Sequence, residues 1–296
     1  MKFKYKTEPY AHQHEALVRS YDKRNFAYFM EMGCGKSKVL IDNIVWLYQE
    51  GRIDTAVIVA PKGVYRNWET SEIPVHFPED IPHEVYVWNP SPNKSQAERL
   101  AAGLEERGVL RILLANVEGF ATKKLPAYVG KFIQGRQSLL AVDESTTIKN
   151  PKAKRTKNLV IVGSKAAYKR ILTGSPVTKS PMDLFAQFQF LDPEILGFDS
   201  FYAYQNRYAI LQQRSMGAHS FKQVLGYRNL EELTKKIDPH IYRVLKKDCL
   251  DLPEKTYTVR HVTLTMEQIR MYKDLQKEAI TLLDTGDLVS TPQVIT

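Results

Sequence analysis

Cysteine is scarce in this sequence of 296 residues, which contains only Cys34 and Cys249. Two cysteines so far apart argue against a disulfide framework or a zinc cluster, and we expect both thiols to be reduced. No apolar stretch approaches the roughly 18 uninterrupted residues of a membrane helix, and the first residues lack the apolar core of a signal peptide. We therefore expect an intracellular protein of the cytoplasm, nucleus or nucleoid that has no membrane contact.

Acidic residues are fewer than basic ones: 33 Asp and Glu stand against 42 Lys and Arg, which gives a net charge of +9. The basic residues cluster at 123–124, 149–157, 235–236 and 243–247. Such an excess favours a polyanionic partner, with nucleic acid as the first candidate; a solvated basic surface is the alternative. With 43% hydrophobic residues, the chain has room for one large α/β domain or two smaller ones.

One glycine is missing from a phosphate-binding motif at residues 30–37, because Met30 occupies its first position. The motif lies between a predicted strand at 26–29 and a predicted amphipathic helix, although a structural turn is the alternative interpretation. Glycines let backbone N–H groups surround phosphates, Lys36 supplies a cation, and the Ser37 hydroxyl is a ligand for Mg²⁺. The residues predicted to bind nucleotide here are Gly33, Cys34, Gly35, Lys36 and Ser37.

Short apolar runs alternate with helix-sized segments through the first half of the chain. They are typical of strands that are buried on both faces, and they indicate a parallel sheet covered by helices. In such sheets, ligands bind at the carboxyl ends of the strands. After the strand at 26–29, the runs lie at 55–60, 85–88, 110–115, 138–142 and 170–173.

Two adjacent carboxylates, Asp143 and Glu144, end the apolar run at 138–142. In phosphoryl transfer one carboxylate holds the Mg²⁺ of the nucleotide while its neighbour polarises the attacking water. We therefore predict that Asp143 is a metal ligand and that Lys36, Asp143 and Glu144 are catalytic. A solvated acidic turn is the alternative.

Small polar residues follow the next apolar run, at Thr173, Gly174 and Ser175. Their hydroxyl groups could bind the acidic pair and couple the state of the γ-phosphate to the rest of the molecule. The composition of this segment alone is that of an ordinary turn. Its position in the sequence after the other two motifs favours the coupling role.

Together these motifs resemble those of superfamily 2 helicases, and within them the Swi/Snf-like ATPases that translocate on double-stranded DNA. Residues 33–37 resemble motif I, whose family form also lacks the first glycine. Residues 143–144 resemble the start of the DEAH-type box, whose histidine is replaced here by Thr146. Residues 9–13 resemble the Q motif, and residues 58–61 with Trp68 resemble motif Ia. Residues 148–150 resemble the Ile-Lys-Asn sequence that continues the box in the Swi/Snf-like branch, and residues 172–177 resemble motif III. The segment that joins the two lobes of the family is resembled by residues 242–248, 252–255 and 264–268.

The resemblance implies a RecA-like P-loop NTPase lobe, with a parallel sheet sandwiched by helices, that uses ATP and Mg²⁺. It implies that Gln13 reads adenine and that double-stranded DNA is the partner. It also implies a second RecA-like lobe; residues 1–296 contain no sequence similar to motif VI, so we expect weak hydrolysis from them alone. The candidate nucleic-acid contacts are Lys62, Lys149, Asn150 and Lys152.

Aromatic residues interleave with basic residues and glutamines from Asp192 to Asp248, and their spacing favours helices. We expect a helical protrusion whose aromatics form a core, with exposed lysines contacting phosphate. Beyond it we predict a strand at 259–264 and a helix at 266–283, opened by a capping box of Thr265 and Gln268. The expected domains are a first lobe at 1–191, its protrusion at 192–250, and a linker with the start of an incomplete second lobe at 251–296.

The sequence therefore predicts the ATP-binding motor lobe of a DNA-dependent ATPase or helicase. One alternative is a nucleotide-dependent module that binds DNA or protein and hydrolyses little ATP. Another is the lobe of an RNA-directed helicase, since motifs I and II are common to both classes.

Overall fold

The computed structural model describes residues 5–216, 219–249, 258–270 and 272–273. The chain divides into two compact units, Met1–Asp251 and Leu252–Thr296. This division lies next to the expected start of the linker, while the domain bounds at 1–191 and 192–250 stay predictions. In the described part of the chain, no helix is long and apolar enough to cross a membrane.

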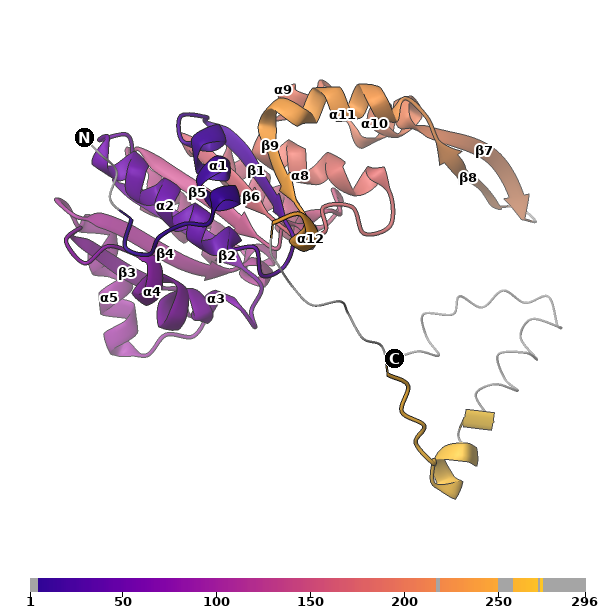
Figure 1. Cartoon of the computed structure of the whole chain (residues 1–296), viewed down its shortest axis with the longest axis horizontal. Coiled ribbons are helices and arrows are strands. Elements are labelled where there is room, and N and C mark those ends of the chain that lie inside the picture. Colours follow the sequence, from indigo (N-terminus) through magenta and orange to yellow (C-terminus); the bar gives the residue numbers. More distant parts are fainter. Residues whose placement is uncertain (1–4, 217–218, 250–257, 271, 274–296) are drawn as a thin grey trace. The chain divides into compact units, whose positions relative to one another are not determined.

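A parallel sheet of seven strands, in the order β3-β4-β2-β5-β6-β1-β9, forms the centre of the first unit (Figure 1). Every residue of β2 and β5 is buried, which explains their continuous apolar sequences. All six strands predicted between residues 26 and 173 are present, and the expected α/β class is confirmed. The strands are β1 (Asn25–Met30), β2 (Thr55–Ala60), β3 (His83–Val87), β4 (Leu110–Asn116), β5 (Ser138–Asp143), β6 (Tyr168–Leu172) and β9 (Ile241–Val244).

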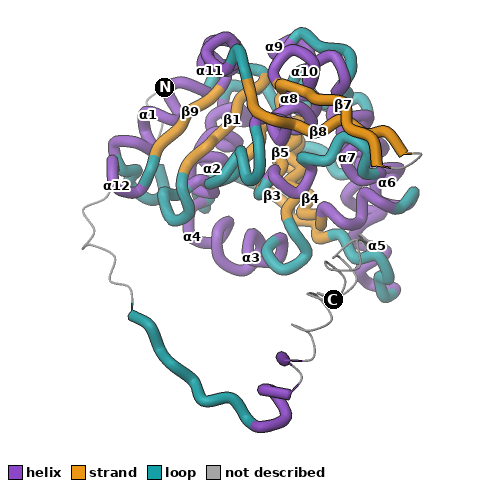
Figure 2. The backbone as a smooth tube through the Cα atoms, turned by 90° about the vertical axis from the view of Figure 1, so that its right-hand side faces the viewer, coloured by secondary structure: helices purple, strands orange, loops and turns teal. Residues whose placement is uncertain are grey.

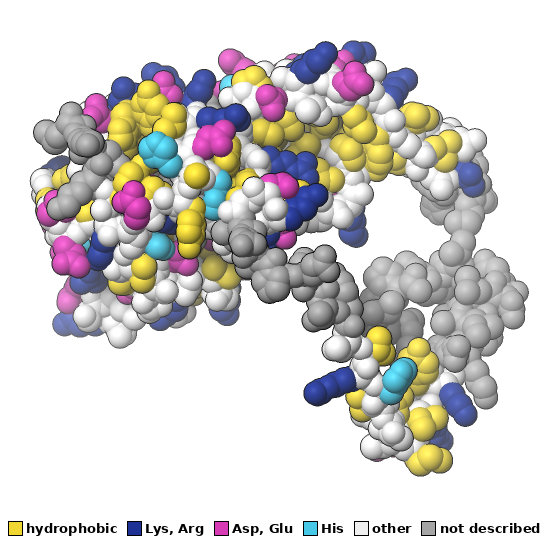
Figure 3. Space-filling view, in the orientation of Figure 1, with side chains coloured by type: hydrophobic (Ala, Val, Ile, Leu, Met, Phe, Trp, Pro, Cys, Tyr) yellow, Lys and Arg dark blue, Asp and Glu magenta, His cyan; other side chains and the backbone are white. Residues whose placement is uncertain are grey.

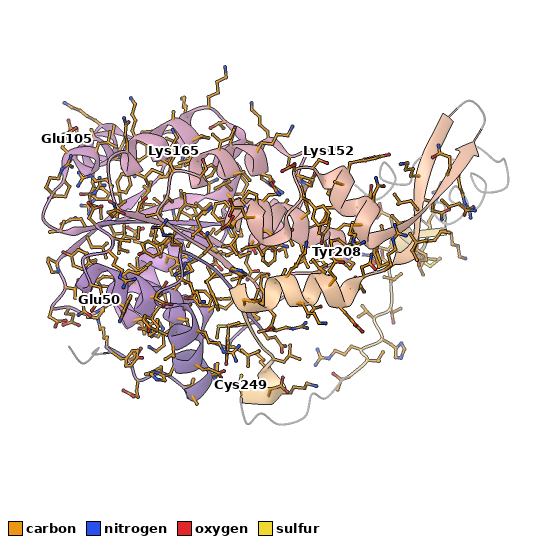
Figure 4. The ribbon with its side chains drawn as sticks, turned by 90° about the horizontal axis from the view of Figure 1, so that it is seen from above. Glu50, Glu105, Lys152, Lys165, Tyr208 and Cys249 are labelled. Carbon is orange, nitrogen blue, oxygen red and sulfur yellow. The ribbon has the colours of Figure 1, made fainter. Side chains whose placement is uncertain are left out.

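Helices cover both faces of the sheet and enclose one hydrophobic cluster on each face. In Figure 4, Glu50 after α2 and Lys165 after α7 lie in the opposite layers. One layer holds α1 (Ala11–Ser20), α2 (Lys36–Gln49), α3 (Tyr65–Asn67), the π-helical turn Trp68–Glu72 and α4 (Ile73–His76). The other holds α5 (Lys94–Glu105), α6 (Lys124–Ile133), α7 (Lys154–Gly163), α8 (Leu184–Leu191) and the 3₁₀ turns Val117–Ala121, Ser145–Ile148 and Pro181–Asp183.

The protrusion differs from the expected all-helical segment, because it also contains an antiparallel hairpin of β7 (Ala209–Met216) and β8 (His219–Tyr227). The hairpin extends away from the sheet (Figure 1), and its Leu225 side chain is 55% exposed. Hydrophobic side chains, in yellow in Figure 3, are visible on the surface of the protrusion. The backbone N–H and C=O groups of the two strands bind each other. This pairing stabilises the strands even though their glutamine-rich composition does not favour a strand. The helical parts are α9 (Pro193–Leu196), α10 (Phe201–Tyr208), α11 (Leu230–Ile237) and the 3₁₀ turn Asp238–His240.

The core interpretation of the protrusion's aromatic residues is confirmed for Tyr204 and Tyr208. Both side chains are fully buried, and their ring centroids lie 4.9 Å apart. Tyr202 on the same helix is 54% exposed, so it lies outside this core. The aromatic cluster joins α10 to α8 and fixes the base of the protrusion on the lobe.

Near the end of the first unit, residues 241–244 form the edge strand β9, which pairs in parallel with β1 (Figure 2). The short helix α12 (Lys246–Cys249) follows it. The prediction of a strand at 259–264 is wrong: these residues are described and form no strand. The predicted capping box is confirmed: the backbone N–H of Thr265 donates to Gln268 Oε1 at 3.0 Å, and that of Gln268 donates to Thr265 Oγ1 at 3.3 Å.

Candidate nucleotide-binding site

The phosphate loop joins the carboxyl end of β1 to the first turn of α2. Two of its glycines adopt the left-handed conformation, with φ of 85° at Gly33 and 81° at Gly35. A Cβ atom on Gly35 would lie 2.2 Å from Nε2 of Gln13. Because a larger residue would be strained and would also clash, glycine is required at this turn.

The first turn of α2 presents the features of an anion site. Its N-cap, Gly35, has no side chain to bind the free N–H groups of the helix. Lys36 is 8% exposed, and in the described part of the chain no hydrogen bond occupies the Ser37 hydroxyl. A cation, open N–H groups and an available hydroxyl fit a phosphate chain with its Mg²⁺.

Asp143 ends β5 and Glu144 follows it, and β5 lies two strands away from β1, which leads into the phosphate loop. Oδ1 of Asp143 accepts a hydrogen bond from the N–H of Glu144 at 2.9 Å, and Oδ2 accepts one from Trp68 Nε1 at 3.2 Å. Burial, followed by the negative charge of Glu144, raises the pKa of Asp143 to about 6, while Lys36 acts in the opposite direction. A buried carboxylate of this kind is stabilised by a bound cation.

Glu144 has a left-handed backbone, with φ 47° and ψ 57°. This conformation is uncommon for a residue with a Cβ atom, and strain of this kind occurs often at functional sites. Here the left-handed residue ends the extended chain of β5 and leads into the 3₁₀ turn Ser145–Ile148.

The segment after β6 lies between the acidic pair and the phosphate loop, because β6 is the strand between β5 and β1. Thr173 Oγ1 donates to Glu144 Oε2 at 3.4 Å, and the N–H of Ser175 donates to Thr173 Oγ1 at 3.2 Å. On the other side, a Cβ on Gly174 would lie 3.1 Å from the backbone nitrogen of Met32. The structure therefore brings together all three predicted coupling residues, the acidic pair and the loop.

A buried glutamine forms a second connection that the sequence analysis missed. Gln187 on α8 accepts a hydrogen bond from Ser145 Oγ at 2.7 Å and donates one to the carbonyl of Pro176 at 2.8 Å. Its side chain thus joins the residue after the acidic pair to the segment after β6. No motif covers Gln187, and its polar character within an apolar helix was the only signal in the sequence.

Gln13 connects α1 to the phosphate loop. Its Oε1 accepts a hydrogen bond from the N–H of Tyr10 at 3.0 Å, and its Nε2 donates to the carbonyl of Cys34 at 3.2 Å. His12 Nε2 donates to the same carbonyl at 2.9 Å. The Gln13 amide therefore already binds the loop and the backbone of Tyr10. One of its N–H groups is left to donate a hydrogen bond to a base.

An open pocket of about 840 Å³ lies between the start of α1 and the end of β9. Tyr10, 64% exposed, borders it, and its ring is nearly parallel to that of His12, with an interplanar angle of 11°. An exposed aromatic face next to the loop offers a stacking surface for a base.

The two cysteines meet at this site. Sγ of Cys34 in the loop lies 3.7 Å from Sγ of Cys249 in α12, and both are free thiols. Burial, followed by a hydrogen bond with Cys249, raises the pKa of Cys34 to about 11, so its thiol stays protonated at neutral pH. A sequence separation of 215 residues concealed this contact.

The residues predicted to contact nucleic acid lie in the segments that follow β2 and β5, which are neighbours in the sheet. Lys62, Asn150 and Lys152 are exposed. Lys149 is half-buried, its Nζ lies 3.9 Å from Asp183 Oδ2, and it also donates to the hydroxyl of Thr178. Three of the four side chains are thus accessible at one edge, while the charge of Lys149 is already paired.

A phosphate loop, an acidic pair and a segment that links them at the carboxyl edge of a parallel sheet are the arrangement of a RecA-like P-loop NTPase lobe. The chain belongs to the family of the SNF2-related domain, whose model matches residues 12–294. This result confirms the resemblance to Swi/Snf-like ATPases that the motifs indicated.

Curated relatives match from both eukaryotes and bacteria. The bovine DNA annealing helicase and endonuclease ZRANB3 is 29% identical over 226 residues, which are 76% of this chain and 20% of that protein. The Escherichia coli Zorya protein ZorD is 27% identical, with coverage of 82% and 22%. The yeast TATA-binding protein-associated factor MOT1 is 34% identical, with coverage of 46% and 7%. The chain thus spans less than a quarter of the length of these relatives.

Among solved structures, the Sulfolobus solfataricus SWI2/SNF2 ATPase core in complex with dsDNA is similar, with a TM-score of 0.61 and 21% sequence identity. The match covers 100% of this chain and 57% of that chain. The likeness supports the fold and confirms the expectation of a RecA-like lobe.

Proposed function

We propose that this chain is the ATP-binding motor lobe of a DNA-dependent ATPase that translocates on double-stranded DNA by ATP hydrolysis. The observation that carries the proposal is the arrangement of the segment after β6, which contacts Glu144 on one side and the phosphate loop on the other. Such an arrangement couples the state of the nucleotide to the rest of the lobe. Membership of the SNF2-related family supports the same function.

In this proposal ATP binds with its base over Tyr10 and its phosphates against the loop and the start of α2. Lys36 neutralises phosphate charge, and Ser37 and Asp143 hold Mg²⁺. When bound, Mg²⁺ neutralises charge that develops on the phosphate oxygens. Glu144 orients the attacking water and accepts its proton, and Thr173 keeps the Glu144 carboxylate in place.

Hydrolysis by residues 1–296 alone is proposed to be slow. Cationic groups on an opposing surface typically increase the rate of phosphoryl transfer by a factor of about 10³–10⁵. The family resemblance assigns such arginines to a second lobe. The site on this lobe is open to water, which weakens its electrostatic contacts.

Duplex DNA is proposed to lie along the carboxyl edge of the sheet, with Lys62, Asn150 and Lys152 contacting its phosphates. Phosphate contacts carry little sequence information, so we expect binding without strong base preference. Lys149 joins them only after it leaves Asp183. The protein is proposed to act where cellular DNA is found, in the cytoplasm or nucleoid of a bacterium or in a nucleus.

The test compares phosphate release by residues 1–296 with release by a version extended through a second lobe, each with saturating duplex DNA. We expect much faster turnover from the longer protein, and none from its Glu144→Gln variant. Comparable rates would show that the active site is complete within residues 1–296. ATP binding without DNA-stimulated release in the longer protein would favour a binding module, and stimulation by RNA alone would favour an RNA-directed enzyme.

A further inference from the structure

The segment that follows β9 lies directly against the phosphate loop. The N–H of Glu31 donates to the carbonyl of Val244 at 3.0 Å, and the N–H of Lys246 donates to Glu31 Oε2 at 2.8 Å. The contact between Cys34 and Cys249 holds the end of α12, labelled in Figure 4, against the same loop. The loop is therefore flanked by the segment after β6 on one side and by α12 on the other.

The side chain of Lys246 lies on the loop backbone. A Cβ atom on Gly33 would be 3.0 Å from Cε and 3.2 Å from Nζ of Lys246. Because Gly33 has no side chain, the ammonium group can lie this close to the loop backbone. The next residue, Lys247, is exposed, whereas Lys246 is half-buried.

The ammonium group of Lys246 has no hydrogen bond or ion pair within the described part of the chain. The neighbouring carboxylate of Glu31 accepts from the backbone of Lys246 and forms no ion pair with its side chain. The buried Lys36 contributes a second positive charge to the same loop. Two cations beside open backbone N–H groups repel each other, and an anion with several charges relieves that repulsion.

We propose that Lys246 is a second phosphate-binding cation of the ATP site and acts with Lys36 on the terminal phosphates. The inference rests on the proposed function and extends it with a residue from the end of the lobe. Lys246 lies shortly before the division of the chain at Leu252. A polyphosphate held by Lys246 thus contacts α12, the last described helix before this division.

Isothermal titration of residues 1–296 with Mg·ATP, Mg·ADP and adenosine tests this proposal. A hydrogen bond to a charged group corresponds to about a tenfold or larger change in affinity. We expect Lys246→Ala and Lys246→Met to weaken ATP and ADP binding about tenfold, while adenosine binding stays unchanged. Lys246→Arg keeps most of the affinity because it keeps the charge. Lys235→Ala is the control: it removes an exposed charge from α11, which does not line the pocket beside Tyr10, and it binds ATP like the parent.

Three outcomes overturn the inference: equal ATP affinity for Lys246→Met and the parent, tighter binding by that variant, or an equal loss for ATP and adenosine. Tighter binding would identify Lys246 as a group that competes with the phosphates. Lys36→Ala separates this failure from failure of the proposed function. If the parent binds ATP and only Lys36→Ala loses it, the ATP site stands and Lys246 is not part of it. If the parent does not bind ATP, the proposed function itself fails.

Discussion

Trp68 Nε1 donates a hydrogen bond to Oδ2 of Asp143 at 3.2 Å, and both side chains are buried. Trp68 opens the π-helical turn that follows α3, and Asp143 ends β5. Because the N–H of Glu144 binds the other oxygen, both carboxylate oxygens are fixed in direction. Trp68 also stabilises the charged form of Asp143, which burial disfavours. A residue outside the phosphate loop thus orients the predicted metal ligand and favours its charged form.

Replacing Trp68 by Phe removes this donor and keeps an aromatic ring in the core. A hydrogen bond to a charged group contributes about 1.5–3 kcal/mol, so we expect Mg²⁺-dependent ATP affinity to fall about tenfold or more. The pKa of Asp143 should rise further above about 6, and the loss should therefore be larger at pH 6 than at pH 8. Mg²⁺ titrations of ATP binding at these pH values measure both effects.

Trp88→Phe is a matched control, since Trp88 is also buried and forms no hydrogen bond with the acidic pair. If the two variants have the same Mg²⁺ and pH dependence, the Trp68 bond has no role in the metal site. Thermal unfolding of both variants shows whether either loss reflects unfolding.

The raised pKa of Asp143 has a defined effect on stability. The pKa rises from 3.8 to about 6 on folding, so the folded state binds a proton more tightly and stability falls as pH rises between these values. At 1.36 kcal/mol per unit, the ionised carboxylate costs about 3 kcal/mol above pH 6. Asp143→Asn carries no charge, so we expect it to unfold at higher urea concentration than the parent at pH 8 while losing Mg·ATP binding.

The gain in stability of Asp143→Asn over the parent should largely disappear at pH 4.5, because Asp143 is protonated in the folded parent at that pH. Burial also raises the pKa of Asp42 to about 6, so both proteins show an additional change in the same pH range. Only the difference between parent and variant isolates Asp143. A difference that does not vary with pH would contradict the assignment.

The strands and their motifs could be predicted because buried parallel strands are continuous apolar runs that end in polar residues. Residues 55–60 show this directly, since the predicted and observed strands coincide. Strand order was not predictable, and it determines which side chains meet. Trp68 reaches Asp143 because β2 lies beside β5, and Lys246 reaches Gly33 because β9 lies beside β1.

The elements that the sequence analysis did not predict, β9 and the hairpin of β7 and β8, have weak hydrophobic patterns for physical reasons. β9 is an edge strand of four residues in which only Tyr242 is buried, so it lacks a continuous apolar run. The hairpin of β7 and β8 projects from the lobe, and its exposed strands are rich in polar residues. Such strands are stabilised by pairing more than by burial, which sequence periodicity does not reveal.

The hydrogen bond between Ser145 and Gln187 gives a prediction about stability. Ser145→Ala leaves the buried Oε1 of Gln187 without its donor, and we expect a loss of about 1–3 kcal/mol in the free energy of unfolding. A double variant, Ser145→Ala with Gln187→Leu, should lose less than the sum of the two single changes. Urea unfolding of all four proteins gives this coupling energy; additive losses would show that the two side chains act independently.

Binding of duplex DNA should weaken steeply as salt rises, because phosphate contacts release counterions. Lys62 is exposed at the carboxyl edge and its ammonium forms no ion pair in the described part of the chain, so Lys62→Ala should lower the log–log salt slope by about one unit. Lys149→Ala should change the slope less, since its charge is paired with Asp183. Asp183→Asn releases Lys149 and should therefore strengthen DNA binding.

Lys165→Ala is the matched control for these DNA-binding variants. It removes the same charge from an exposed position after α7, beyond the other end of that helix from Lys152 (Figure 4). Fluorescence anisotropy with a labelled duplex at several salt concentrations measures each slope. Equal effects of Lys62→Ala and Lys165→Ala would show that binding depends on net charge alone. An affinity independent of salt would rule out a phosphate-binding surface at the carboxyl edge.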